Sequence, residues 1–114
     1  MAVKEKIIGD VAVLSVSGNL MGGNETQEIH TVVKSLIADG IKKVVIDLSK
    51  VKWLNSQGLG VLMASFTSLR NANGNLRIAG ATDKVNSLLM ITQLITIFDN
   101  YETVDRAVAT FKSV

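Results

Sequence analysis

The serine at position 56 is the side chain in this sequence best placed to do chemistry. It follows Asn55 and begins the segment Ser56–Gly60, after which apolar residues recur at helical spacing. A serine at a helix N-terminus lies beside unpaired backbone N–H groups and the positive end of the helix dipole. A phosphoryl group on that hydroxyl would be well accommodated, with the dipole contributing about 0.3–1 kcal/mol. The same residues also suit a purely structural role, because Asn and Ser are common helix N-caps.

Two glycines, Gly58 and Gly60, fall in the first turn of this expected helix. Each lowers helix propensity by about 1 kcal/mol, and together they would leave a bare surface that the backbone of another protein could approach closely. A modifiable serine beside such a surface predicts a docking face with a charge switch. The glycines also resemble the start of a dinucleotide-binding fingerprint, but Met63 stands where the third glycine belongs. Nucleotide binding through this loop is therefore not expected.

The composition excludes several classes of site. The chain has 114 residues, no cysteine and a single histidine, His30. Disulfide frameworks, zinc fingers, iron–sulfur clusters and cysteine nucleophiles are excluded, and so is a site with several histidine ligands. We therefore expect no metal and no cofactor, and we place His30 on the surface, opposite the apolar stripe of the first helix. No serine–histidine–acid set, catalytic carboxylate pair or phosphate-binding loop can be assembled convincingly, which disfavours an enzyme.

Positive charge gathers in the middle third of the sequence, around Ser56. The formal net charge is only +2, but six basic residues between positions 41 and 77 face the single acidic residue Asp47. Those basic residues are Lys42, Lys43, Lys50, Lys52, Arg70 and Arg77. Solvated loops and helix ends are the favoured explanation, and a weakly basic face for an acidic partner is the alternative. Nucleic acid is not expected, because the five aromatic residues form no stacking pattern with the basic ones.

Neither the start of the sequence nor its most apolar stretch predicts contact with a membrane. The first residues are charged, with no apolar run behind them, so we expect no signal peptide. The stretch 88–98 is interrupted by polar residues and is shorter than the roughly 18 residues of a membrane span. We expect a cytoplasmic protein without membrane insertion.

Periodicity predicts strands that alternate with helices. We expect strands at 4–8, 11–17, 44–46, 76–79 and 96–98, and helices over 24–40 and 56–71, from Asp83, and after a cap at Thr103. The buried stripe of the second helix should contain Leu59, Leu62, Phe66 and Leu69. This order indicates one α/β domain over residues 1–114, with a largely parallel sheet and an N-terminal hairpin.

Several other conspicuous side chains receive structural assignments. Asp47 should end a central strand and hydrogen-bond the loop before the second helix, with Trp53 and Leu54 packed under that loop. Core packing is favoured for Met63 and for Leu89–Ile91 over an apolar docking patch. Three serines are expected on helix surfaces: Ser65, Ser68 and Ser87.

The segments Asp47–Ser49 and Asn55–Gly60 closely resemble the STAS domain of bacterial anti-sigma factor antagonists. Val16–Leu20 is similar to that family's strand-end Gly-x-Leu segment, and Leu94–Ala107 to its C-terminal strand and helix. The likeness covers roughly residues 3–111. It implies the STAS fold: a mixed, largely parallel sheet with an N-terminal hairpin, packed with about four helices.

The resemblance also implies a partner switch controlled by phosphorylation. The unphosphorylated protein would bind an anti-sigma factor that is also a serine protein kinase. The kinase would phosphorylate the serine that corresponds to Ser56, the complex would separate, and a PP2C-type phosphatase would reverse the reaction. The antagonist itself would catalyse nothing. The expected partner-binding residues are Met21, Gly22, Gly23, Asn55, Ser56, Gln57, Gly58, Leu59 and Gly60.

Two residues depart from the family pattern. Asn55 stands where the family commonly has aspartate before the serine, and Met21, followed by two glycines, stands where it commonly has an acidic residue. Both changes remove negative charge near Ser56, which either eases accommodation of a phosphate or alters recognition by the kinase. The alternative function is a constitutive STAS scaffold subunit of a transporter-accessory or stress-sensing complex. In that case Ser56 would be a helix cap and the same face a permanent interface.

Overall fold

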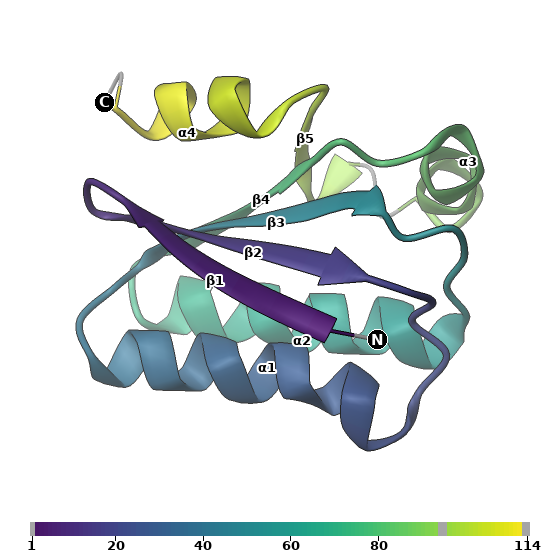
Figure 1. The fold of residues 1–114 in the computed structure, drawn as a ribbon, viewed down its shortest axis with the longest axis horizontal. Coiled ribbons are helices and arrows are strands. Elements are labelled where there is room, and N and C mark those ends of the chain that lie inside the picture. Colours follow the sequence, from purple (N-terminus) through teal and green to yellow (C-terminus); the bar gives the residue numbers. More distant parts are fainter. Residues whose placement is uncertain (1, 94–95, 113–114) are drawn as a thin grey trace.

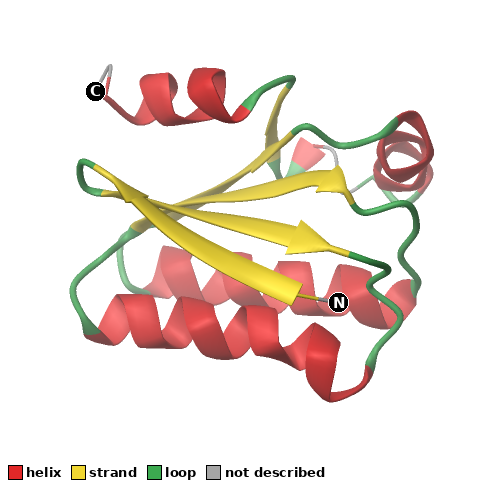
Figure 2. Ribbon diagram, in the orientation of Figure 1, coloured by secondary structure: helices red, strands yellow, loops and turns green. Residues whose placement is uncertain are grey.

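A computed structural model describes residues 2–93 and 96–112, which form a five-stranded sheet with helices on both faces (Figures 1 and 2). The elements in chain order are β1 (Ala2–Ile8), β2 (Val11–Ser17), α1 (Gly23–Ala38), β3 (Lys43–Lys50), α2 (Ser56–Asn71), β4 (Asn75–Ala79), α3 (Asp83–Ile91), β5 (Asp99–Tyr101) and α4 (Val104–Lys112).

The sheet has the strand order β1-β2-β3-β4-β5. β1 and β2 pair antiparallel through a turn at Gly9, whose φ is 62°, and every other neighbouring pair is parallel. The predicted hairpin and the predicted, largely parallel sheet are therefore both confirmed. Because parallel strands end at one edge, the loops that follow β2 and β3 come together there.

The core lies on both faces of β3. Val44, Ile46 and Leu48 are fully buried in the larger cluster, beneath α1 and α2. Val45 is fully buried in the smaller cluster, which α4 covers from the opposite face with Ala107, Val108 and Phe111 (Figure 1). The continuous apolar run at 44–46 therefore predicted a strand buried on both faces correctly.

The strand predicted at 96–98 is wrong. β5 comprises Asp99–Tyr101, and residues 96–98 form a turn before it. Phe98 is instead buried in the core, with its ring edge-to-face to Phe66 at 5.5 Å between centroids. Its apolar character serves helix packing rather than a strand, and the neighbouring residues 94 and 95 lie outside the described part of the chain.

Helix α2 begins and ends where the sequence predicts, but its buried face is rotated. Leu62 and Leu69 are buried, whereas Leu59 and Phe66 are only half-buried. Val61 and Ser65 complete the buried face, so the prediction of a surface position for Ser65 is wrong. The helix packs against both the sheet and α1, and these two contacts together bury a wider stripe than one face alone.

Core packing is confirmed for Leu89 and Met63 but wrong for the two residues that follow Leu89. Met90 is 62% exposed and Ile91 is 78% exposed at the end of α3. Successive helical residues point about 100° apart, so only Leu89 of the three reaches the core.

Candidate functional site

The loops that follow β2 and β3 are joined by backbone hydrogen bonds. Leu20 and Leu54 form an isolated parallel bridge. The Leu20 N–H donates to the Trp53 carbonyl at 3.1 Å, and the Asn55 N–H donates to the Leu20 carbonyl at 3.1 Å. The start of α2 is therefore fixed to the end of β2 by main-chain contacts that do not depend on side-chain identity.

Asn55 uses both ends of its side-chain amide. Its Oδ1 accepts from the Gly58 N–H at 3.0 Å and caps α2, while its Nδ2 donates to the Met21 carbonyl at 2.9 Å. An aspartate could make the cap, but an ionised carboxylate has no proton to donate to a carbonyl. Asparagine at this position therefore adds a tie between the two loops that aspartate could not make.

The two glycines of the first turn have different roles. Gly58 is buried, and a Cβ there would overlap the carbonyl oxygen of Leu20. A Cβ at Gly60 would meet open space, and this residue is exposed. The expected bare surface is therefore right for Gly60 and wrong for Gly58, which is small so that the helix can approach Leu20.

The start of α1 lies beside the start of α2. Gly22 has a φ of 103°, and a Cβ there would overlap the side chain of Gln57. Thr26, which is buried, accepts from the Gly22 N–H at 2.9 Å and donates to the Gly22 carbonyl at 3.0 Å. These bonds satisfy the polar groups of Gly22, the N-cap residue of α1, which has no side chain to cap the helix.

The structure exposes Ser56 as the first residue of α2. Gln57 is also exposed, as are Met21 at 49% and Trp53 at 43% in the adjoining loops. Leu54 is buried as predicted, but the prediction that Trp53 packs under the loop is wrong. We use "Ser56 surface" for the exposed set Met21, Gly23, Trp53, Ser56, Gln57 and Gly60.

Trp53 is the member of this surface that sequence reasoning missed. Its exposure follows from the Leu20–Leu54 bridge, which turns Leu54 inward and its neighbour outward. An aromatic residue within a short loop was the available signal, but no periodicity in residues 51–55 separates the inward from the outward position.

His30 is half-buried between α1 and α2, so its predicted place on the open surface is wrong. Its Nε2 lies 2.9 Å from the Ser68 hydroxyl, which means that Ser68 also faces the other helix. A groove of about 270 Å³ runs beside it and includes Thr26, Gln57 and Gly60 among its lining residues. Burial lowers the pKa of His30, and the positive charge of Lys34 lowers it further.

The prediction that Asp47 hydrogen-bonds the loop before Ser56 is wrong. The Asp47 Oδ1 accepts from the Ser49 N–H at 2.9 Å, because β3 continues to Lys50 and keeps Asp47 within the strand. The basic residues do not surround Ser56 either. Four of the six, Lys42, Lys43, Arg70 and Arg77, line a hollow at the other end of α2.

Over 2–93 and 96–112, none of the helices combines the length and apolar character that crossing a bilayer requires. The same residues contain no group of three or more histidine, aspartate or glutamate side chains that could hold a metal ion.

Alanine substitutions at Gly58 and Gly60 form a matched pair that tests the packing of α2 on Leu20. Gly60→Ala should raise the free energy of unfolding by about 0.5–1 kcal/mol, because alanine favours the helix and meets no atom. Gly58→Ala should lower it by about 1–3 kcal/mol, because the new Cβ overlaps backbone. Urea denaturation measures both, and equal stability of the two variants would contradict the account.

The single histidine allows its pKa to be read from one NMR ring signal. The midpoint for His30 should lie below 6.5, because burial disfavours the charged ring. The folded state then binds fewer protons than the unfolded state just below pH 6.5, so the free energy of unfolding should fall as the pH falls through that window. His30→Gln should lose this part of the pH dependence. A midpoint at or above 6.5 would show that the burial has no electrostatic effect.

Comparison with known proteins identifies the family. The STAS domain family profile matches residues 2–107. A Thermotoga maritima protein that carries the provisional name anti-sigma factor antagonist is 28% identical to this chain over 102 residues, and the match covers 90% of each chain. The Staphylococcus aureus protein named anti-sigma-B factor antagonist is 28% identical over 67 residues, covering 59% of this chain and 62% of that protein.

A solved structure agrees with these sequence relatives. The crystal structure of an anti-sigma factor antagonist from Mycobacterium paratuberculosis superimposes with a TM-score of 0.80 at 27% identity. The superposition covers 96% of this chain and 92% of that one. Sequence match and fold therefore agree over nearly the same residues, and the chain belongs to the STAS domain family.

Proposed function

We propose that this protein is an anti-sigma factor antagonist. In its unphosphorylated form it binds an anti-sigma factor that is also a serine protein kinase, and phosphorylation of Ser56 releases it. The observation that carries the proposal is the exposed Ser56 at the first position of α2, on a helix start that Asn55 and Leu20 hold in place. Membership of the STAS family and the names of its relatives support it.

The partner binds the Ser56 surface. Met21 and Trp53 offer two large, partly exposed apolar side chains, and Gly60 allows close approach of a partner's backbone. Burial of exposed aromatic and methionine side chains is a common source of binding energy at protein interfaces. Asn55, Gly58 and Gly22 act from beneath this surface by fixing the two helix starts, and the half-buried Leu59 joins α2 to the core.

Phosphorylation affects the free protein and the complex differently. A phosphate adds about −1.5 to −2 charges, which the N–H groups and dipole of the α2 N-terminus can accommodate in water. In an interface the same group must be desolvated and must fit against the partner. A penalty of about 3–4 kcal/mol there would weaken binding several hundredfold.

The switch is reversible because Ser56 is exposed once the partner has left. A PP2C-type phosphatase can then remove the phosphate and restore the binding form. In this scheme ATP belongs to the kinase, and the antagonist itself requires no cofactor and performs no catalysis. We place the protein in the cytoplasm, where such a kinase and its sigma factor act.

Intact-mass measurement after incubation with the cognate kinase and ATP tests the assignment of the site. The wild-type protein should gain the mass of one phosphoryl group, and Ser56→Ala should gain none. Ser87→Ala removes another exposed serine and is the matched control, which should be phosphorylated like the wild type. Phosphate that is still added to Ser56→Ala, or absent from the wild type, would refute the assignment.

A further inference from the structure

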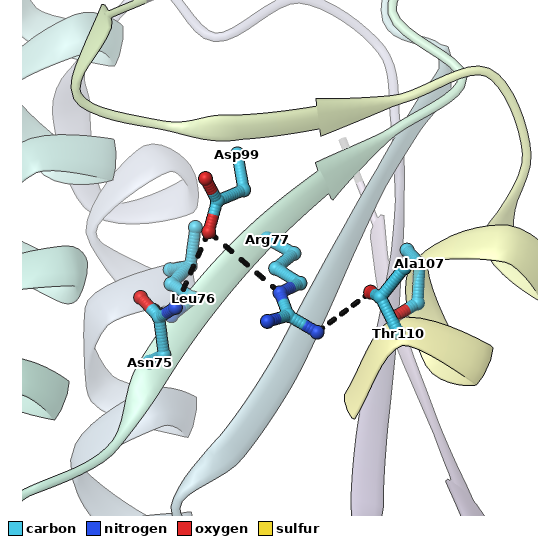
Figure 3. Close-up of polar contacts among 6 residues, drawn as sticks. All are labelled: Asn75, Leu76, Arg77, Asp99, Ala107 and Thr110. Carbon is cyan, nitrogen blue, oxygen red and sulfur yellow. Dashed lines mark hydrogen bonds and ion pairs between the residues drawn. The ribbon is translucent and has the colours of Figure 1, made fainter. Parts of the chain in front are cut away.

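Arg77 lies in β4, and its side chain extends toward Asp99 of β5 and Thr110 of α4 (Figure 3). Its guanidinium carbon lies 3.8 Å from the centre of the Phe111 ring, and its Nη1 donates to the Thr110 hydroxyl at 2.6 Å. Its Nε lies 3.7 Å from Asp99 Oδ2, close enough for an ion pair but too far for a hydrogen bond. The side chain is only 12% exposed.

Arg77 is largely buried, and few of its hydrogen-bond donors have a partner among the described residues. A guanidinium carries five N–H donors. Within the described residues, the bond to Thr110 is the one hydrogen bond that its side chain makes, and the buried Nε has no hydrogen-bond partner. Buried donors without partners are uncommon in folded proteins and often mark a place for water or an ion.

Arg77 lines a hollow of about 420 Å³, and three other cationic side chains line the same hollow. Lys43 is the first residue of β3, Lys42 directly precedes it, and Arg70 comes from the last turn of α2. Asn73 and Asn75 add amide groups, and the ring of Phe111 forms part of the wall. This volume is within the range of pockets that hold small molecules. We call the hollow the Arg77 pocket.

Close backbone packing fixes the shape of this pocket. A Cβ on Gly74 would overlap the Lys42 carbonyl oxygen, and the Asn75 N–H donates to that same oxygen at 2.9 Å. Asn73 has a φ of 63°, which ends α2 and turns the chain into β4. The cations therefore lie within regular elements or, for Lys42, directly beside one.

The charges in the pocket do not cancel. Lys43 forms an ion pair with Asp10 at 2.8 Å, and Asp99 lies beside Arg77. Lys42 and Arg70 make no ion pair or side-chain hydrogen bond with any residue in 2–93 or 96–112. Four cations against two carboxylates leave two positive charges that a multivalent anion could neutralise.

We propose that the Arg77 pocket binds a small, multivalent anion that bears a phosphoryl group. The group is either free phosphate or pyrophosphate, or the phosphate of a small organic molecule. Arg77 supplies planar donors at the base of the pocket, held in orientation by Phe111 and Thr110. Lys42 and Arg70 supply charge at the rim. This site is separate from the Ser56 surface, because α2 spans about 24 Å between them.

Calorimetric titration with sodium pyrophosphate tests the site, with inorganic phosphate and ribose 5-phosphate as further arms. Pyrophosphate should bind the wild type, and Lys42→Gln with Arg70→Gln should weaken that binding by about tenfold or more. Both side chains are on exposed residues, so the double variant should unfold at the same urea concentration as the wild type. Tighter binding of ribose 5-phosphate than of phosphate would assign the group to an organic molecule, and the reverse order to a free anion.

The matched control removes two other cations. Lys52→Gln with Lys84→Gln changes the net charge equally, on residues that are exposed and lie outside the pocket. This variant should retain wild-type affinity for pyrophosphate. The proposal is overturned if the wild type binds none of the three anions at millimolar concentration. It is also overturned if the control variant loses as much affinity as the pocket variant.

Discussion

The first turn of α2 lies directly against the backbone of Leu20, with room between them for a glycine and no larger residue. Leu20 also exchanges backbone hydrogen bonds with Trp53 and Asn55. One residue therefore connects the end of β2, the loop after β3 and the start of α2. These contacts fix the first turn of α2 from below. The exposed position of Ser56 therefore does not depend on contacts of the Ser56 side chain.

In this arrangement, the residues that fix the two helix starts differ from most of the residues that are exposed on the Ser56 surface. Asn55, Gly58 and Gly22 set the geometry through contacts within the protein, whereas Met21, Trp53 and Ser56 are exposed. A phosphate on Ser56 would change the charge of the outward layer without disturbing the inward one. Four of the six basic residues between positions 41 and 77 lie at the other end of α2, where they line the Arg77 pocket. The two ends can thus carry different binding chemistry.

Local signals predicted the elements well, and distant contacts account for the errors. The bounds of α2 were predictable because Asn55 caps the helix and Asn73-Gly74 ends it, and both signals lie within a few residues of the helix. Strand β5 was misplaced because its three residues are defined by pairing with β4. The exposure of Trp53 and of His30 was predicted wrongly because it also depends on distant contacts. Their exposure depends on Leu20 and Ser68, which are far away in the sequence.

Ser56 and the family resemblance predicted the candidate site, and the structure added which of its neighbours are exposed. The central claim is that phosphate on Ser56 disrupts an interface formed at the α2 N-terminus. Calorimetric titration of the partner kinase with unphosphorylated and fully phosphorylated protein tests it most directly. Phosphorylation should weaken binding several hundredfold, corresponding to about 3–4 kcal/mol, while Ser56→Ala should bind like the unphosphorylated wild type. Equal affinity of the two forms would contradict the switch and favour a permanent interface.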